Sequence, residues 1–287
     1  MPKRQISATE AFDLRQALHV ATLDALMASR RWEPGDLVFQ GGTSLHLAHG
    51  SPRFSEDLDF LVNSSLKLDA IGDAILARLE GTPWVPGDTR LTVTKAKEGH
   101  NPHAFVVSIG GPDVIGSVRV KVELWQTDEA ALAAVNAIVA PVRLARGPAA
   151  GIQAFVPTAD LPEIHADKVF ALAARPYLKP RDVFDLHWLA MHDGLRECSV
   201  DDLRVRLATY PSETPSAWVD KAFKRRLDLL NGATAIQTDL ARWLPSSWPL
   251  STKDAAAMAE TALAALDQGI DLMRQVAAEH DNDSPAP

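Results

Sequence analysis

The chain has 287 residues, 46% of them hydrophobic, and its 29 basic and 37 acidic residues give a net charge of −8. This length and apolar share indicate a folded protein of about two domains. The acidic balance argues against a protein-wide basic surface for non-specific DNA binding, but it does not exclude a local basic groove. One cysteine, Cys198, excludes an intramolecular disulfide and a cysteine-based zinc site. Because no apolar run could span a membrane and no signal peptide is evident, we expect a cytoplasmic protein.

Periodicity in the first half of the sequence predicts alternating helices and strands. Ser7 and Glu10 have the spacing of a capping box, and the helix that they start is expected to end before Pro34. A glycine pair, Gly41-Gly42, then separates a short strand from a short helix. The expected elements are a strand at 37–39, helices at 43–49 and 66–80, a strand at 58–62, and a β-meander of strands at 91–94, 105–109 and 118–125.

The pattern changes after Pro157, since no strand alternation follows residue 159. Helices are expected at 160–174, 181–192, 199–209, 215–230 and 252–279. The predicted fold class is therefore α+β. We expect an N-terminal α/β domain at residues 1–157, built on a mixed β-sheet with flanking helices. A C-terminal helical domain at 158–280 and a disordered tail at 281–287 would follow it.

Two aspartates beside the strand predicted at 58–62 form the most informative pattern. Asp57 and Asp59 project from one face of that strand, because side chains alternate with a period of two. Two carboxylates so close together repel each other unless a cation lies between them. Oxygen ligands of this kind suit Mg²⁺ or Mn²⁺, which often also hold the phosphates of a nucleotide. The spacing therefore predicts a divalent metal site.

A possible phosphate cradle lies upstream of these aspartates. Gly41 and Gly42 open the predicted short helix, and glycines let the backbone approach a phosphate closely. Thr43 and Ser44 add hydroxyl groups. A lone glycine pair is usually only a turn, so the prediction depends on its combination with the aspartates.

A third carboxylate is available on the last strand of the predicted meander. Glu123 shares the polar face of that strand with Arg119 and Lys121. It would serve a second metal or act as a base, or it would simply pair with one of its basic neighbours. An Asp-x-Asp pair also occurs on solvated strands and in metal-dependent glycosyltransferases, so the conjunction of motifs is more specific than any one of them.

Together these motifs resemble the nucleotidyltransferase pattern of the polymerase-β superfamily, and more closely the AbiEii/AbiGii toxin family of nucleotidyltransferases. Gly41 to Leu45 reads Gly-Gly-Thr-x-Leu, and Arg53 to Asp59 reads Arg-x-Ser-x-Asp-h-Asp. The resemblance implies a nucleotidyltransferase-like fold and places Arg53 in the nucleotide-binding motif. Ser55 would contact a phosphate, accept an inhibitory modification, or only mark the entry to the strand.

The same family carries a lysine motif and an Arg-Asp-x-x-Asp-Leu motif in its helical half. Lys168 lies in an otherwise apolar helical stretch, and Asp182 and Asp185 share one face of the next predicted helix. The residues alone favour an ordinary salt bridge between two helices. The resemblance instead implies that Lys168 and one aspartate, Asp185 in preference to Asp182, are catalytic. Lys168 would hold the triphosphate beside Asp182, and Asp185 would orient the lysine or accept a proton.

We therefore expect a magnesium-dependent enzyme that transfers a nucleoside monophosphate from an NTP to an acceptor hydroxyl and releases pyrophosphate. The resemblance implies an RNA acceptor such as the 3′ end of tRNA, a cognate antitoxin as partner, and a role as a toxin or in phage defence. Two alternatives stay open. The acceptor would be a small molecule or a protein, which the net negative charge favours, or the chain would bind nucleotide or a partner without catalysis.

Overall fold

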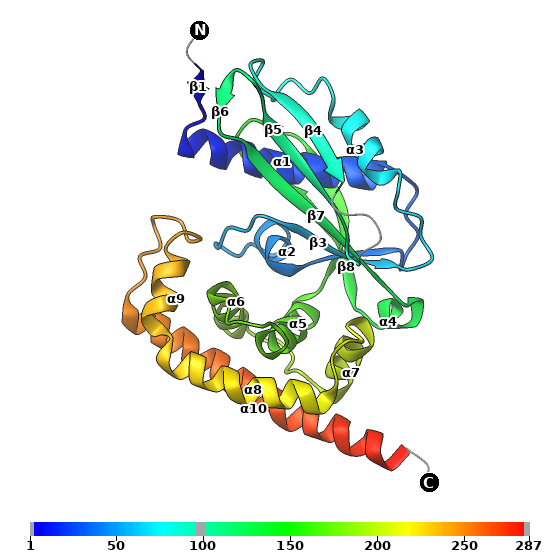
Figure 1. Ribbon diagram of the computed structural model, residues 1–287, viewed down its shortest axis with the longest axis vertical. Helices are drawn as coiled ribbons and strands as arrows, with labels where there is room; N and C mark the ends of the chain where they lie inside the picture. Colours follow the sequence, from blue (N-terminus) through cyan, green and yellow to red (C-terminus); the bar gives the residue numbers. More distant parts are fainter. Residues whose placement is uncertain (1–2, 96–100, 284–287) are drawn as a thin grey trace. The chain divides into compact units, whose positions relative to one another are not determined.

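The computed structural model describes residues 3–95 and 101–283, with side chains as far as residue 279. The chain forms two compact units (Figure 1). The first, called the sheet unit, comprises Met1–Gly50, Ser55–Ala133 and Ala137–Ala159. The second, called the helical unit, comprises Ser51–Phe54, Ala134–Asn136 and Asp160–Pro287. The domains predicted at residues 1–157 and 158–280 stay a prediction, because compact units of one chain need not fold independently.

A seven-stranded mixed sheet organises the sheet unit, in the order β4-β5-β7-β3-β2-β9-β8. Strands β3 and β7 pair in parallel, as do β2 and β9, whereas the other neighbours are antiparallel. A separate short pairing joins β1 to β6. The elements are β1 (Arg4–Gln5), α1 (Ala8–Ala28), β2 (Leu37–Gln40), α2 (Gly41–Leu47), β3 (Leu58–Asn63), α3 (Ile71–Leu79), β4 (Arg90–Lys95), β5 (His103–Gly110), β6 (Val114–Ile115), β7 (Val118–Thr127), α4 (Glu129–Ala133), β8 (Ala137–Arg143) and β9 (Gln153–Ala159).

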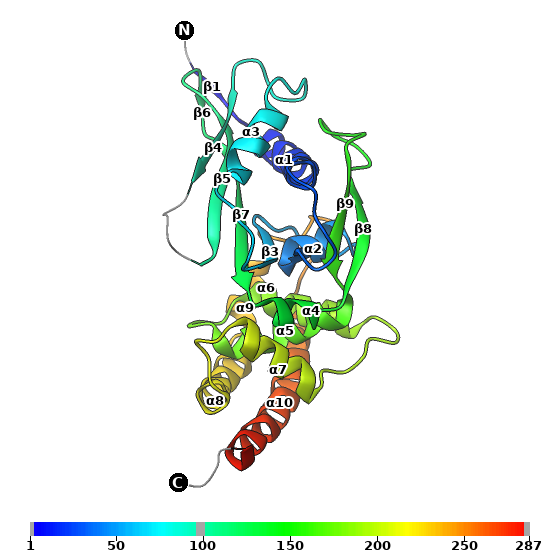
Figure 2. The same ribbon diagram turned by 90° about the vertical axis from the view of Figure 1, so that its right-hand side faces the viewer.

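One face of the sheet is apolar and buries the core of this unit. Alternate strand residues point into it, and Leu58, Phe60 and Val62 of β3 are all almost fully buried there. Helix α1 covers this face: it contacts both β7 and β9, and Figure 2 shows it lying between those strands. Because side chains alternate along a strand, the intervening positions, including Asp59, belong to the opposite face.

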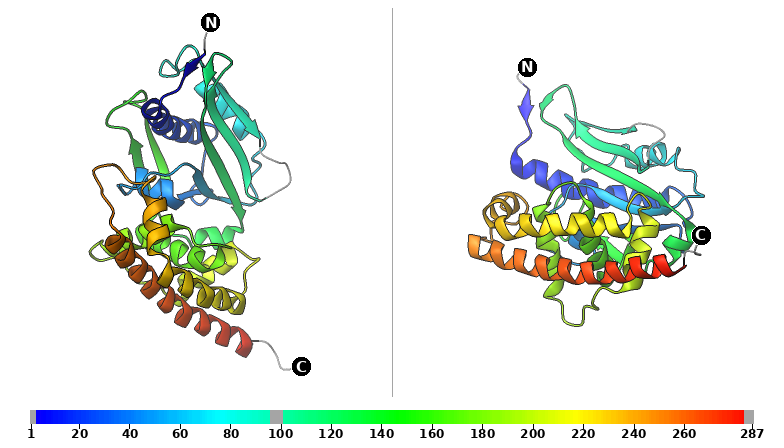
Figure 3. Two further views of the ribbon diagram at one scale, coloured as in Figure 1. Left: turned by 60° about the vertical axis from the view of Figure 1, so that its left-hand side comes forward. Right: turned by 60° about the horizontal axis from the view of Figure 1, so that its bottom comes forward.

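The helical unit packs its helices against the longest of them, α10. Its elements are α5 (Leu161–Ala174), α6 (Pro180–Ala190), α7 (Val200–Thr209), α8 (Pro215–Asn231), α9 (Ala233–Leu240) and α10 (Thr252–Asp283). Helices α8 and α10 lie side by side (Figure 3). Gly269 permits close packing in α10, since a Cβ atom there would lie 2.8 Å from Val169 of α5 and 3.1 Å from Trp218 of α8. No described helix is both long and apolar enough to cross a membrane.

The predicted α+β class is confirmed, and so are most of the predicted elements. The Ser7 hydroxyl accepts the Glu10 N–H at 3.1 Å, and α1 ends well before Pro34. The helix predicted at 66–80 is shorter, and the short helix includes both glycines at its start. Strands β8 and β9 and helix α9 were not predicted. The tail predicted to be disordered at 281–287 is wrong for residues 281–283, which continue α10; residues 284–287 lie outside the described residues.

Candidate active site

A row of polar side chains crosses the sheet on the face opposite the core. In the strand register Asp59 of β3 pairs with Gln40 of β2 on one side and with Glu123 of β7 on the other. Strands in a sheet lie about 4.7–4.9 Å apart, so these three polar residues are immediate neighbours. Asp57 directly precedes β3, and both it and Asp59 are half-buried. The structure therefore places Asp59 and Glu123 on neighbouring strands, with Asp57 two residues before Asp59.

The first turn of α2, which follows β2 directly, comes very close to this row. Gly41 adopts a φ of +79°, in the left-handed region that favours glycine. A Cβ atom on Gly41 would lie 2.7 Å from Oδ2 of Asp59. Only glycine therefore fits between the turn and the Asp59 carboxylate. The close approach found here is to the Asp59 carboxylate, and the predicted approach of this backbone to a phosphate stays a prediction.

The two hydroxyl groups that follow the glycines are buried and hold the turn. The Thr43 hydroxyl donates to the main-chain carbonyl of Asp57, and the Ser44 hydroxyl donates to the carbonyl of Gly41 at 2.8 Å. Thr43 and Ser44 are fully buried and Gly42 is buried, whereas Ser55 is half-buried. The hydrogen bond from the Thr43 hydroxyl fixes the position of the main chain at Asp57. Phosphate binding by Gly42, Thr43, Ser44 and Ser55 stays a prediction.

A lysine already lies among the carboxylates of the row. Nζ of Lys121 donates to Oε1 of Glu123 at 2.6 Å, on the same face of β7. The hydrogen bond to Glu123 and the negative charges of Asp57 and Asp59 raise the pKa of Lys121, although partial burial opposes them. The pairing of Glu123 with Lys121, one of the two interpretations of the sequence, is confirmed. Lys121 itself was not singled out as a site residue, and its position two residues before Glu123 was the only signal.

The donor set fits a divalent metal. Within the part of the chain that the structure describes, no group of three or more His, Cys, Asp or Glu side chains converges as a metal cage. Mg²⁺ rarely needs such a cage, because it usually takes one or two carboxylates and completes its shell with water and substrate phosphates. Asp57 and Asp59 supply hard oxygen donors of that kind, and Gly41 leaves no side chain over Asp59. These residues would hold the ion, with Glu123 beside them.

The residues predicted in the helical half form a second, buried group. Nζ of Lys168 in α5 lies 2.7 Å from Oδ1 of Asp182 and 2.8 Å from Oδ2 of Asp185, both in α6. The three side chains are almost completely buried. The salt bridge between two helices, which the residue types alone favour, is therefore present. The catalytic roles of these residues stay a prediction.

Arg53 joins this group from a distant part of the sequence. Its guanidinium donates to both oxygens of Asp185, with Nε to Oδ1 at 2.7 Å and Nη2 to Oδ2 at 2.8 Å. Asp185 is fully buried and Arg53 is only 2% exposed. Arg175 lies 3.0 Å from Asp182 on the other side of the network. Both oxygens of Asp185 are thus engaged by cations, so the geometry supports its predicted role in orienting Lys168.

The charges in this network keep one another ionised. Burial by itself would raise the pKa of Asp182 and Asp185, but nearby Lys168 with Arg175 or Arg53 outweighs it and lowers both pKa values. Burial would likewise lower the pKa of Lys168, but the two aspartates outweigh it and raise that pKa. The network is therefore a set of fixed charges at neutral pH.

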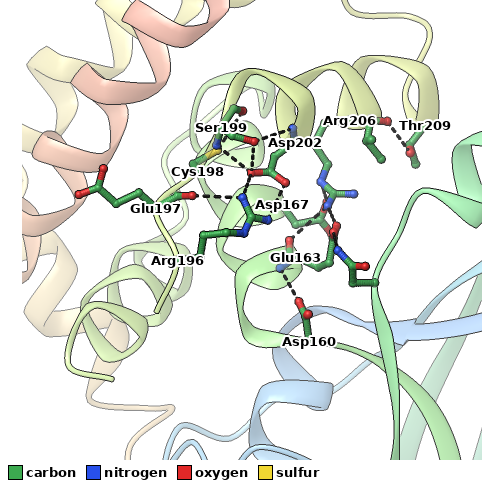
Figure 4. Close-up of polar contacts among 12 residues, drawn as sticks. Asp160, Glu163, Asp167, Arg196, Glu197, Cys198, Ser199, Asp202, Arg206 and Thr209 are labelled. Carbon is green, nitrogen blue, oxygen red and sulfur yellow. Dashed lines mark hydrogen bonds and ion pairs between the residues drawn. The ribbon is translucent and has the colours of Figure 1, made fainter. Parts of the chain in front are cut away.

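A further polar cluster lies between α5 and α7, and no sequence motif indicated it (Figure 4). Buried Arg206 donates to Glu163, and its Nε lies 2.9 Å from Oδ1 of Asp167. Glu163 and Asp167 are one helical turn apart, which lets a single guanidinium reach both. Asp202 caps α7 together with Ser199. These contacts join α7 to α5. The cluster therefore stabilises α5, the helix that carries Lys168.

Comparisons with solved structures agree with this fold. The chain is similar to MenT4, a nucleotidyltransferase toxin of Mycobacterium tuberculosis, with 17% identity, a TM-score of 0.55, and coverage of 92% of this chain and 87% of that one. It is also similar to a Helicobacter pylori protein described as a nucleotidyltransferase, with 18% identity, a TM-score of 0.50, and coverage of 91% of this chain and 98% of that one. The predicted nucleotidyltransferase-like fold is confirmed.

The comparison with protein families identifies the family of the chain, and not only its fold. A search among curated proteins gave no match. The family model described as "Nucleotidyl transferase AbiEii toxin, Type IV TA system" matches residues 24–246, which is well over half of the chain. That span includes the glycine turn, the aspartate pair and the buried lysine network. The chain belongs to the AbiEii nucleotidyl transferase toxin family and is a nucleotidyltransferase.

Proposed function

We propose that this enzyme transfers a nucleoside monophosphate from an NTP to a hydroxyl group at the 3′ end of an RNA, with tRNA as the acceptor. The observation that carries the proposal is the row of Asp59 and Glu123 on neighbouring strands, with Asp57 beside it and glycine Gly41 against Asp59. In this reaction the acceptor oxygen forms a bond to the α-phosphorus. The bond from that phosphorus to its bridging oxygen breaks, pyrophosphate leaves, and the hydroxyl proton passes to water.

Asp57 and Asp59 are the proposed ligands of Mg²⁺ or Mn²⁺, assisted by Glu123. A divalent ion held there supplies charge neutralisation for the triphosphate and the attacking oxygen. The protein keeps the Asp59 carboxylate in place through the register of β3 and the tight turn at Gly41. Gly42, Thr43 and Ser44 lie in the first turn of helix α2, and we propose that the backbone N–H groups there face the nucleotide phosphates.

We assign Lys168 and Asp185 to a supporting role in the same reaction. Their side chains are buried and engaged with each other, and Asp185 also holds Arg53 through two hydrogen bonds. Arg53 stands four residues before Asp57 in the chain. Because Asp185 holds Arg53, it restrains the segment of chain that leads to the metal ligands. Loss of Asp185 would therefore lower the transfer rate by letting Asp57 shift.

Local positive charge supports an RNA acceptor despite the net charge of −8. The segment that leads from α5 into the start of α6 carries Arg175, Lys179 and Arg181 within seven residues. Burial, followed by the positive charge of nearby Arg175, lowers the pKa of Lys179. Tyr177 in the same segment is 61% exposed. Cations beside an exposed aromatic ring suit a single-stranded RNA end, which offers phosphates and an unstacked base.

The biological role proposed here follows from the family. As a member of a toxin family of type IV toxin–antitoxin systems, the enzyme would arrest growth by modifying RNA in the cytoplasm, as part of phage defence. A cognate antitoxin is the proposed protein partner.

The test incubates the purified protein with Mg²⁺, total cellular RNA and each NTP in turn, labelled in the α-phosphate. We expect label in a tRNA-sized band with one NTP, and none with Asp57→Ala or after chelation of the metal. Label on the protein itself, or only on an added small acceptor, would refute the RNA acceptor but keep the enzyme class. Full activity of Asp57→Ala would refute the assignment of the metal site.

A further inference from the structure

Lys121 lies beside the carboxylate row of the sheet unit. Its Nζ lies 2.6 Å from Oε1 of Glu123, which in turn neighbours Asp59 across the parallel strand pair. The register continues to Asp57, which precedes Leu58, the partner of Val122. Lys121 thus pairs with one carboxylate of the row, and its strand is the neighbour of the strand that carries the other two. Like charges on facing strand positions destabilise a sheet, and a cation beside Asp59 and Glu123 offsets that repulsion.

The Lys121 side chain is held beside the carboxylate row by charge and not by burial. The side chain is 44% exposed, and an ammonium on a flexible four-carbon stem moves easily between water and a carboxylate. No other described basic side chain forms an ion pair with Glu123. Arg119, two residues earlier on the same face of β7, is exposed and lies one strand repeat farther from the carboxylates.

We propose that Lys121 is an internal counter-ion that holds the carboxylate row together without metal and is displaced when a divalent cation binds. The inference rests on the proposed function, because it needs a metal site at Asp57 and Asp59. It has a direct consequence for affinity. Wild-type protein must release the Lys121–Glu123 pair before Glu123 can assist the metal, and the remaining ammonium repels the incoming ion.

The size of the effect follows from Coulomb's law. A divalent ion and an ammonium about 5 Å apart, in a solvent-like dielectric, repel each other enough to change the affinity by about tenfold. An arginine one strand repeat away changes it by about two- to threefold. Because salt screens exposed charges, the effect should shrink at high ionic strength.

The experiment measures Mn²⁺ binding to chelator-stripped full-length protein by the electron paramagnetic resonance signal of the free ion, with no nucleotide present. We expect Lys121→Met to bind Mn²⁺ about tenfold more tightly than wild type, and Arg119→Met about two- to threefold more tightly. Lys121→Arg keeps the charge and should match wild type. Lys67→Met, an exposed lysine beyond the other end of β3, is the matched control and should also match wild type.

Equal affinities of Lys121→Met and Lys67→Met, or weaker binding by Lys121→Met, would overturn the counter-ion role. The same holds if Lys121→Arg binds as tightly as Lys121→Met, since charge would then not be the cause. A variant with both Asp57→Ala and Asp59→Ala separates this inference from the proposed function. If that variant binds Mn²⁺ like wild type, the metal site and the Lys121 role are both lost. If binding needs the aspartates but ignores Lys121, only the counter-ion role is lost.

Discussion

Replacing Gly41 with alanine imposes two costs that can be measured separately. The φ of +79° at this position is unfavourable for any residue with a Cβ atom and costs about 1–2 kcal/mol. The new methyl carbon would also lie 2.7 Å from Oδ2 of Asp59, well inside van der Waals contact. The Asp59 carboxylate must then move by about half an ångström.

The first cost appears in stability and the second in activity. We expect the free energy of unfolding to fall by about 1–2 kcal/mol, measured by urea denaturation. We expect the rate of nucleotidyl transfer to fall about 10- to 100-fold, because a misplacement of about 1 Å at a reacting group can cost about 100-fold. Gly35→Ala is the matched control: its φ is +86°, but no atom lies within 4 Å of the new carbon.

The control should lose the same stability and keep its transfer rate. If Gly41→Ala also transfers at the wild-type rate, the Asp59 carboxylate does not need its position and the proposed metal site is wrong. If both variants lose activity equally, the loss comes from backbone strain and not from contact with Asp59.

Three further perturbations test other parts of the structure. Asp57→Asn and Asp59→Asn should abolish transfer, because they remove the proposed metal ligands; transfer at the wild-type rate by either variant would contradict that assignment. Asp185→Ala should cost about 3–5 kcal/mol in urea unfolding, since it breaks buried ion pairs, whereas exposed Asp201→Ala should cost under about 1 kcal/mol; equal costs would contradict the buried network. Burial lowers the pKa of His19 to about 4, so the unfolded chain binds more protons than the folded one between that value and 6.5. The free energy of unfolding should therefore fall by about 2 kcal/mol from pH 7.5 to pH 5, and His19→Gln, compared with wild type over that range, should lose this dependence; an unchanged pH dependence would contradict it.

Local signals were sufficient for much of the fold. The start of α1 depends on Ser7 and Glu10, which are three residues apart and contact each other directly. Strand β8 was missed because Pro141 argues against a strand, since proline has no N–H to donate. Strand β8 tolerates proline because it is an edge strand of the sheet. The N–H groups on its outer side have no neighbouring strand to pair with. Helix α9 follows Gly232 directly and has no side-chain cap, so nothing local marked its start.

The site shows the same division between near and distant residues. Asp57 and Asp59 share a face by strand periodicity alone, and the sequence predicted this. That Glu123 lies next to Asp59 depends on the register of two parallel strands, which no local pattern fixes. The contact of Arg53 with Asp185 joins residues that are 132 positions apart in the sequence, and neither residue type nor spacing indicates it. The close approach of Gly41 to Asp59 likewise became visible only in three dimensions.

The parallel pairing of β3 with β7 also determines when the carboxylate row can form during synthesis. Parallel neighbours cannot be joined by a tight turn, and here α3, β4, β5 and β6 are made between them. A ribosome that has just released β3 has delivered both aspartates, but it has not yet made the strand that carries Glu123 and Lys121. Fragments that end before residue 118 therefore contain the complete Asp-x-Asp motif and still lack the row. In the cell that makes this toxin, the carboxylate row can therefore assemble only after at least two-fifths of the chain has been translated.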